Sequence, residues 1–391
     1  MARSRILIVQ PSLQPPGGGN GVAAFMLQAL RDEHALSLLT WERIDLLAVN
    51  RYFGTSLRAT DFAALAVPRR LQAALDRLPF PASTLKASVL RRRAKRLVGE
   101  FNLTMSAQNE VDFGRPGIQY IHYPVRHVDP LPVDLRWYHH RWSLALYERV
   151  WSVVAPFDDR TMRANLTLVN SAWTGEIVSK LHGIPVRVIH PPAPGAFPDV
   201  PWGERDDGFV CIGRVSPEKE LESVIEIVGR VRAARPDAHL HIVGSDDHAA
   251  YARRLREVAR RAGPWVTLEG MLPIDALERL VSAHRYVIHG MREEHFGMSV
   301  AQAVRAGCIP FVPDGGGQVE VVGDEPALRY RSTDDAVGKI IAMMADGRRQ
   351  GQVRARLAAR AERFSPERFM ADIRDVASDA LMTAGPARRG S

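Results

Sequence analysis

The residues with the clearest chemical potential lie between positions 291 and 307. An apolar run leads into a polar loop with Glu294 and His295, and Phe296-Gly297 then begins a helix with apolar residues at helical spacing. Free N–H groups and the helix dipole at such a helix start favour an anion, while a nearby carboxylate accepts hydrogen bonds from hydroxyl groups. The segment therefore predicts a site for an oxygen-rich anion, and a sugar attached to a diphosphate fits this description.

A second set of charges follows the predicted strand Gly208–Gly213. Arg214 comes directly after this strand, and Lys219 lies near the start of a helix expected to run to about residue 234. Ser216 and Pro217 are typical of a helix N-terminus, with Ser216 as the N-cap. Two cations and free N–H groups at a helix start can bind a diphosphate; two solvated cations in a loop are the alternative.

His122 ends the predicted strand 118–122, and ligands of open α/β sheets bind beyond the carboxyl ends of the strands. A hydrogen-bonded structural histidine is the alternative interpretation. The glycine-rich segment 15–21, which contains Gly18 and Gly19, precedes a helix expected at 22–31. Because glycines let the backbone approach a ligand closely, we interpret this segment as a loop bordering a cleft, with a plain strand-to-helix turn as the alternative.

Short apolar runs alternate with helical patterns along the chain, which predicts an α/β protein with parallel sheets. A proline-rich segment at 191–207 separates two such series, so two Rossmann-like domains are expected. Strands are expected at 5–9, 35–39, 102–106, 118–122, 166–169 and 186–190, and then at 208–213, 239–244, 266–270, 285–289, 309–312 and 328–331. Three helices are expected to follow, at 334–345, 347–363 and 366–384.

These motifs resemble those of a known family. Glu294-x-Phe-Gly, Ala306-Gly307 and Gly-Gly-Gly-x-x-Glu320 resemble the nucleotide-sugar signature of the retaining glycosyltransferase family 4, which has the GT-B fold. His-Phe-Gly, Tyr-Ile-His-Tyr-Pro and Asn-Ser-x-Trp-Thr174 are similar to the dolichol-linked-oligosaccharide mannosyltransferase branch. The family has a second Glu eight positions after the first. Here that position is Gln302, which keeps the capacity for hydrogen bonding to a ribose hydroxyl but not the charge.

The resemblance implies a GT-B architecture, in which two Rossmann-like domains face a central cleft. Residues 1–190 would form an acceptor-binding domain and residues 208–364 a nucleotide-sugar-binding domain, with residues 191–207 as the linker. A C-terminal helix at 365–385 would cross back to the first domain.

The resemblance also implies roles for individual residues. Arg214 and Lys219 match the pair that binds the pyrophosphate, Glu294 would hold the sugar hydroxyls, and His122 would approach the transferred sugar. The further donor-binding residues that we expect are Gly18, Gly19, Gly213, Ser245, Met271, His295, Phe296, Gly297, Met298, Ser299 and Gln302.

The implied reaction moves a hexose, with mannose favoured, from a nucleoside diphosphate to a hydroxyl of a glycan, a lipid-linked sugar or a small molecule. GDP-mannose is the favoured donor substrate. Positive side chains would stabilise the departing diphosphate, so neither a cofactor nor a metal is expected. Two alternatives remain at this point: a nucleotide-sugar 2-epimerase on the same fold, and a non-catalytic nucleotide-sugar binding protein, which Gln302 makes conceivable.

Composition sets outer bounds on these interpretations. The chain has 391 residues, of which 46% are hydrophobic and 25% are charged, as in ordinary globular proteins. We expect neither a signal peptide nor a membrane span, and therefore a cytoplasmic protein. The net charge of +8 suits an anionic substrate or an anionic membrane surface. Cys211 and Cys308 adjoin predicted strands, so buried reduced thiols are expected, with one disulfide as the alternative.

The region 69–100 is basic, and its segment 86–98 has interleaved apolar residues. A basic amphipathic helix can lie on an anionic membrane, so a peripheral membrane contact through residues 86–98 is one interpretation. A solvated helix face is the alternative. Nucleic acid is not expected as a partner, because no aromatic stacking platform accompanies the charge. An aromatic stripe at 131–156 favours a core helix, with a role in holding a lipid-linked acceptor as the alternative.

Overall fold

The structure is a computed structural model that describes residues 3–67, 72–73, 75, 83–125 and 156–384. The chain divides into two compact units, one of Met1–Pro192 with Pro366–Ser391 and the other of Ala193–Ser365. The segment 193–207 therefore groups with the second unit, and the C-terminal helix groups with the first. The stripe of aromatic residues at 131–156 lies almost wholly outside the described residues.

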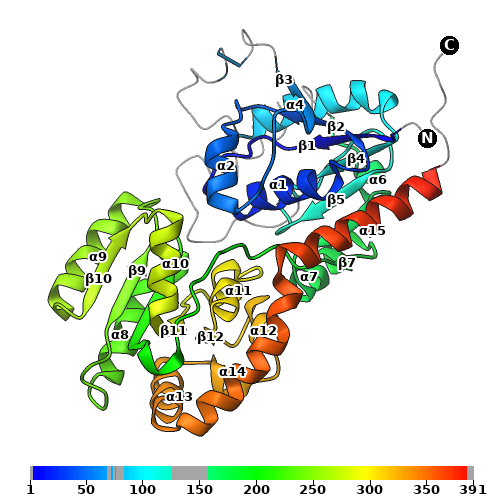
Figure 1. The fold of residues 1–391 in the computed structure, drawn as a ribbon. Helices are drawn as coiled ribbons and strands as arrows, with labels where there is room; N and C mark the ends of the chain where they lie inside the picture. Colours follow the sequence, from blue (N-terminus) through cyan, green and yellow to red (C-terminus); the bar gives the residue numbers. More distant parts are fainter. Residues whose placement is uncertain (1–2, 68–71, 74, 76–82, 126–155, 385–391) are drawn as a thin grey trace. The chain divides into compact units, whose positions relative to one another are not determined.

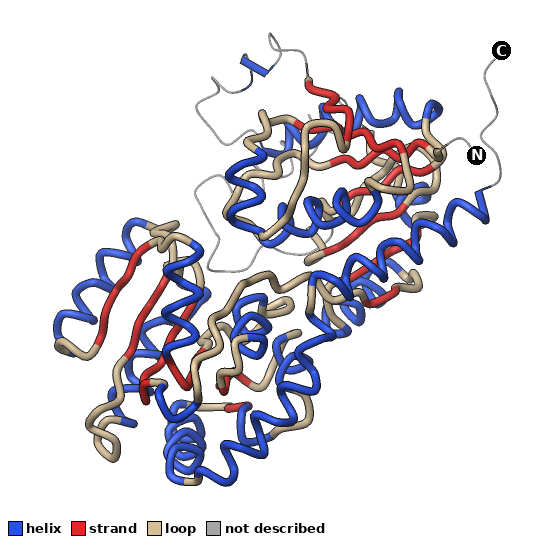
Figure 2. Tube along the Cα trace, viewed as in Figure 1, coloured by secondary structure: helices blue, strands red, loops and turns tan. Residues whose placement is uncertain are grey.

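In its described part, the first unit is built on a seven-stranded parallel sheet in the order β3-β2-β1-β4-β5-β6-β7. Helices cover this sheet (Figures 1 and 2). The strands are β1 (Arg5–Val9), β2 (Ala35–Thr40), β3 (Phe62–Ala66), β4 (Leu103–Ser106), β5 (Ile118–Ile121), β6 (Leu166–Val169) and β7 (Arg187–Val188). The helices are α1 (Gly18–Leu30), α2 (Leu46–Phe53), α4 (Ser83–Leu97), α6 (Asp159–Arg163), α7 (Ala172–His182) and α15 (Pro366–Ala384).

The last helix, α15, completes the core of the first unit although it lies about 180 residues beyond β7 in the sequence. Phe369, Ile373 and Val376 of α15 are buried in the same apolar cluster as Phe25 and Met26 of α1. The helix α15, drawn in red in Figure 1, therefore packs on the same face of the sheet as α1. The apolar residues of α15 therefore stabilise the first sheet and not the second.

The second unit, over the residues described, has a six-stranded parallel sheet in the order β10-β9-β8-β11-β12-β13. Its strands are β8 (Asp206–Ile212), β9 (Leu240–Val243), β10 (Val266–Gly270), β11 (His284–Ile288), β12 (Ile309–Pro313) and β13 (Arg329–Tyr330). Its helices are α8 (Leu221–Val231), α9 (Ala249–Ala262), α10 (Ile274–Ala283), α11 (Met298–Arg305), α12 (Gln318–Val322), α13 (Thr333–Ala345) and α14 (Gly347–Ala361).

Three local expectations are corrected by the structure. The helix expected at 22–31 begins at Gly18, so Gly18 and Gly19 lie in the first turn of α1 and not in a loop. Ser216 does not cap the following helix. A 3₁₀ turn at Pro217–Lys219 comes first, and Glu220 interrupts the helix with a left-handed backbone (φ 47°), so that α8 begins only at Leu221.

The basic segment expected to form a membrane-facing amphipathic helix forms α4, but its apolar face is already used. Leu90, Ala94 and Val98 are buried in a cluster with Leu7 and Val9 of β1. These apolar residues therefore pack on the first sheet, while Arg92 and Arg96 of the same helix are exposed. None of the helices in the described residues is long and apolar enough to cross a membrane.

The cysteine prediction is confirmed, because both thiols are free and buried. Burial raises the pKa of Cys211 and of Cys308 to about 12, so both thiols stay protonated at neutral pH.

Candidate functional site

The predicted charges of the second unit converge beyond the carboxyl ends of β8 and β11. The Nζ atom of Lys219, which follows β8, lies 2.5 Å from Oε2 of Glu294, which follows β11. His289, the residue after β11, places its Nε2 atom 3.3 Å from the same oxygen. The three side chains are largely shielded from solvent, with exposed fractions of 14%, 16% and 2%. Sequence motifs 75 residues apart thus meet in one cluster.

The electrostatics of this cluster keep Glu294 ionised. Burial opposes the charge of the Glu294 carboxylate, but the ammonium of Lys219 and the ring of His289 outweigh it and hold the pKa of Glu294 well below its usual value. Burial is the largest influence on His289 and lowers its pKa. At neutral pH the cluster therefore contains a carboxylate, an ammonium group and a neutral imidazole.

The glycine loop before α12 fixes the main chain of Glu294. The N–H of Gly317 donates to the carbonyl oxygen of Glu294 over 2.7 Å. Gly316 has a left-handed backbone (φ 71°), and a Cβ atom on it would lie only 2.3 Å from the same carbonyl oxygen. Any other residue at 316 would push the loop away from Glu294. The Gly-Gly-Gly segment therefore serves to hold the acidic loop in place.

The N-terminus of α11 lies directly after this acidic loop. Gly297 stands at the N-cap position and has no side chain to cap the helix, so the first N–H groups of Met298 and Ser299 have no acceptor within the helix. Phe296 is 2% exposed and packs on Phe364 with ring centroids 5.8 Å apart, so only its main chain could contact a ligand. The amide of Gln302 donates to the carbonyl oxygen of Pro194 over 2.8 Å.

Arg214 contributes a more exposed cation near the cluster. Its guanidinium is 60% exposed and lies 3.2 Å from Glu218 and 3.5 Å from Asp247. Burial lowers the pKa of His295, and the positive charges of Lys219 and Arg214 lower it further. The two cations and His295 therefore act on one another electrostatically.

A pocket of about 310 Å³ lies at the carboxyl ends of β9 and β10. Its walls include Val215, Gly244, Ser245 and Met271, of which Met271 is 49% exposed. Gly213 is not in this wall; it packs beside the stem of Lys219, where a Cβ atom would lie 3.4 Å from Cε. The two predicted donor-binding residues Ser245 and Met271 thus share one cavity.

His122 lies at the carboxyl end of β5 in the first unit. Its Nε2 atom is 3.1 Å from the carbonyl oxygen of Ala107, and its main-chain N–H donates to Asn109 over 2.8 Å. A Cβ atom on Gly19 would lie 3.1 Å from the same Nε2 atom. The first turn of α1, which contains Gly18 and Gly19, therefore lies beside His122.

Sequence reasoning missed three residues of these clusters. His289 was interpreted only as the end of a strand, and neither Glu218 nor Asp247 was expected in the site. The signal for His289 is its place after an apolar strand, since a polar residue there lies at the edge where ligands bind. A larger hollow of about 430 Å³ in the first unit includes Arg31 and Asp61, but these two already pair over 3.0 Å.

Known proteins resemble this chain in sequence and in fold. Residues 196–364 match the model of the family "Glycosyl transferases group 1". The chain is 25% identical over 231 residues to human GDP-Man:Man(3)GlcNAc(2)-PP-Dol alpha-1,2-mannosyltransferase, an alignment that covers 53% of this chain and 46% of that protein. It is 28% identical over 265 residues to the Neurospora crassa protein of the same name, and this alignment covers 57% of this chain and 46% of that protein. The chain thus spans about half the length of the curated relatives it matches.

Solved structures share the whole fold. HepE from Anabaena, solved with UDP and glucose, superimposes with a TM-score of 0.67 at 15% identity, covering 96% of this chain and 100% of that one. Sucrose-phosphate synthase from Thermosynechococcus elongatus superimposes with a TM-score of 0.68 at 15% identity, and the superposition covers 97% of this chain and 100% of that chain. Together with the two parallel sheets, this likeness establishes the α/β fold class as GT-B. The match to the glycosyl transferases group 1 model spans nearly all of the second unit.

Proposed function

We propose that the chain is a retaining glycosyltransferase that moves a hexose from a nucleoside diphosphate to an acceptor hydroxyl. One observation carries the proposal: Lys219, Glu294 and His289 meet beyond the carboxyl ends of two parallel strands. Open α/β sheets bind ligands at that edge. The cluster offers both a fixed cation for a phosphate and an ionised carboxylate for hydroxyl groups.

The barrier of such a reaction lies in breaking the bond between the sugar and the diphosphate, whose departing oxygen gains negative charge. Preorganised donors aimed at that charge are the main source of rate enhancement. The ammonium of Lys219 carries three N–H donors, so it can hold Glu294 and a phosphate oxygen together. Arg214 and the first N–H groups of α11 add positive potential.

Glu294 is assigned to the hydroxyl groups of the sugar. Within the described residues, its contacts with Lys219 and His289 both fall on Oε2, which leaves Oε1 to accept from a hydroxyl group. The lowered pKa keeps the carboxylate ionised at neutral pH. The pocket beside Ser245 and Met271 is assigned to the nucleobase, because its volume of about 310 Å³ is within the range of small-molecule sites.

GDP-mannose is the proposed donor, because the curated relatives are named for GDP-Man. The acceptor would bind to the first unit, where His122 lies at the carboxyl edge of the sheet. Its proposed class is a glycan or a lipid-linked sugar. A lipid-linked acceptor would bring the chain to a membrane surface. Arg92 and Arg96, both exposed on α4, would then meet anionic lipids electrostatically.

Thermal-shift measurements with GDP, UDP, ADP and dTDP test the donor, since a ligand of the folded state raises the melting temperature. We expect GDP to give the largest shift. Consumption of GDP-mannose is then followed with and without acceptor extracts. Consumption that depends on acceptor supports transfer; consumption without acceptor identifies a 2-epimerase or a hydrolase. Binding without consumption under either condition identifies a binding protein and overturns the proposal.

A further inference from the structure

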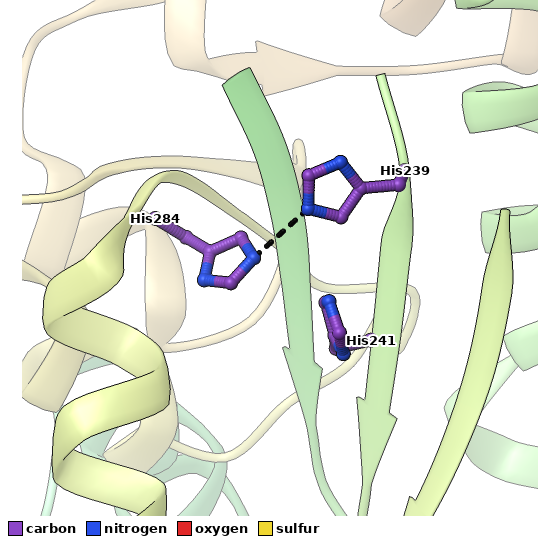
Figure 3. Close-up of side chains that lie close together, drawn as sticks. All are labelled: His239, His241 and His284. Carbon is purple, nitrogen blue, oxygen red and sulfur yellow. Dashed lines mark hydrogen bonds between the residues drawn. The ribbon is translucent and has the colours of Figure 1, made fainter. Parts of the chain in front are cut away.

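A cluster of three histidines lies at the opposite edge of the second sheet from the candidate donor site. His239 immediately precedes β9, His241 lies within β9, and His284 begins β11. These positions are near the amino ends of parallel strands, whereas Lys219 and Glu294 follow the carboxyl ends. One ring nitrogen of each histidine lies within 4.8 Å of the other two. Figure 3 shows the three rings gathered over the central strand, β8.

The topology explains why the rings meet. Residues 239 and 241 are two positions apart, so both side chains project from the same face of β9. The strand β8 separates β9 from β11, and its Gly208 lies beneath the rings. A Cβ atom on Gly208 would be 2.3 Å from Nε2 of His239 and 2.7 Å from Cδ2 of His284. The cluster therefore depends on a glycine at this position.

Each ring has a hydrogen-bond partner at its Nδ1 atom. Nε2 is therefore the nitrogen that could bind a metal ion. Nδ1 of His284 donates to the carbonyl oxygen of Leu280 over 2.7 Å, and Nδ1 of His241 faces the Glu269 carboxylate at 2.6 Å. Nδ1 of His239 lies 3.2 Å from the carbonyl oxygen of Asp237. Metal-binding histidines commonly use the second nitrogen in this way, on a carboxylate or a main-chain carbonyl.

The contact between His239 and His284 depends on which nitrogen of each ring carries the proton: one Nε2–H can donate to the other Nε2, or both rings can donate through Nδ1. Their Nε2 atoms are 3.1 Å apart. If both rings donate through Nδ1, two lone pairs face each other, which is unfavourable unless a proton or a metal ion lies between them. Nitrogens bound at about 2.0–2.1 Å to a tetrahedral zinc ion lie roughly 3.3 Å apart, close to the observed separation.

We propose that His239, His241 and His284 form a binding site for one divalent transition-metal ion of the zinc, cobalt and nickel class. Three imidazole nitrogens suit these ions, whereas magnesium and calcium prefer oxygen ligands. His241 would be the third ligand, and water would complete the coordination.

The ion would link β9 to β11 across β8, so its effect would be on the stability of the second unit. An ion that binds only the folded state raises the melting temperature, by on the order of 5 °C at a hundredfold excess over Kd. The site takes no part in the proposed sugar transfer, because it lies at the amino edge of the strands. Its test is therefore independent of that proposal.

The experiment uses the full chain, stripped of metal with a chelator, and measures Zn²⁺ binding by competition with a chromophoric chelator. We expect one equivalent to bind, and bound Co²⁺ to show the visible absorption of a low-symmetry nitrogen site. His241→Ala should weaken Zn²⁺ binding by about 100-fold or more. Glu269→Gln, which keeps all three rings, should weaken it by about 10- to 100-fold.

His248→Asn is the matched control, because it removes another histidine of this unit while asparagine can still cap α9. Its Zn²⁺ affinity should equal that of the unaltered chain. Circular dichroism shows whether each variant is folded, and Glu269→Gln provides the test if His241→Ala is not. The absence of a bound equivalent overturns the proposal, as does equal affinity in the unaltered chain and in folded His241→Ala or Glu269→Gln.

Discussion

The carboxyl edges of the two sheets carry different chemistry. In the second unit, Lys219 and Glu294 form a shielded ion pair with His289 against the same oxygen. In the first unit, His122 is held by neutral hydrogen bonds to Ala107 and Asn109. A shielded ion pair is costly to desolvate and makes sense where a charged ligand binds. We propose from this difference that the second unit binds the anionic donor, while the first unit binds the acceptor.

Removing Lys219, the cation at the carboxyl edge of the second unit's sheet, should have the largest effect on turnover. In Lys219→Ala no ammonium group remains to stabilise the departing diphosphate, so we expect turnover at saturating donor to fall by about 100-fold or more. Arg279→Ala is the control, since Arg279 is 63% exposed in a surface pair with Asp275. Steady-state rates for both variants test the comparison. Unchanged turnover in Lys219→Ala would remove the diphosphate role from this edge.

Removing the negative charge should separate sugar positioning from nucleotide binding. Glu294→Gln keeps the shape but weakens the contacts with Lys219 and the sugar hydroxyls, so we expect turnover to fall by about 10- to 100-fold. The Kd for the nucleoside diphosphate, measured by calorimetry, should change by less than about threefold. A folded variant that loses nucleotide binding as strongly as turnover would contradict this division of roles.

The His122→Ala variant tests the role of the carboxyl edge of the first unit's sheet. We expect transfer to an acceptor to fall by about tenfold, the value of one hydrogen bond to a ligand, with unchanged binding of the nucleoside diphosphate. His34→Ala is the matched control, because His34 immediately precedes β2 at the amino edge of the same sheet. If nucleotide affinity fell with transfer, His122 would belong to the donor site, and the contrast between the two edges would fail.

The pH dependence of stability gives a further test of the ion pair. The folded pKa of Glu294 is held well below its usual 4.5, so its stabilising contribution is complete above pH 4.5 and is lost as the pH falls towards the folded pKa. We expect the free energy of unfolding to fall more steeply below pH 4.5 in the unaltered chain than in Glu294→Gln. Denaturant titrations at a series of pH values measure both slopes. Identical slopes would show that Glu294 has an ordinary pKa.

The smallest effect should come from Gln302. Its amide donates to Pro194, so Gln302→Ala should lower the free energy of unfolding by about 1 kcal/mol and change the Kd for the nucleoside diphosphate by less than about threefold. Denaturant unfolding and calorimetry measure the two quantities. A tenfold loss of nucleotide affinity would instead assign to Gln302 the ribose contact that its place in the motif suggests.

The sequence predicted most of the sheets, because fully buried parallel strands are continuous apolar runs. The bounds of β1 and β10 agree with the expected segments to the residue. The edge strand β3 was missed although Phe62–Ala66 is an apolar run, because three of its five residues are alanine, which has a low preference for strands. The Ser216 cap failed because a 3₁₀ turn at Pro217–Lys219 and the left-handed Glu220 come between Ser216 and the start of α8.

The candidate site was predictable only in part. Motif spacing placed Lys219 and Glu294 at the same edge of the sheet, but not in contact with each other. The role of His289 depends on the path of the acidic loop, and the histidine cluster depends on Gly208 of the strand between β9 and β11. Such contacts between neighbouring strands follow from the order of the sheet, which the sequence pattern alone does not determine.

The central claim is that the carboxyl edge of the second sheet binds the diphosphate through Lys219 and Arg214 while Glu294 holds the sugar. A crystal structure with the intact donor or an unreactive analogue tests it most directly. We predict phosphate oxygens within about 3 Å of the Nζ atom of Lys219 and a sugar hydroxyl at a similar distance from the Glu294 carboxylate. A donor bound elsewhere, with Lys219 and Glu294 still paired only with each other, would contradict the account.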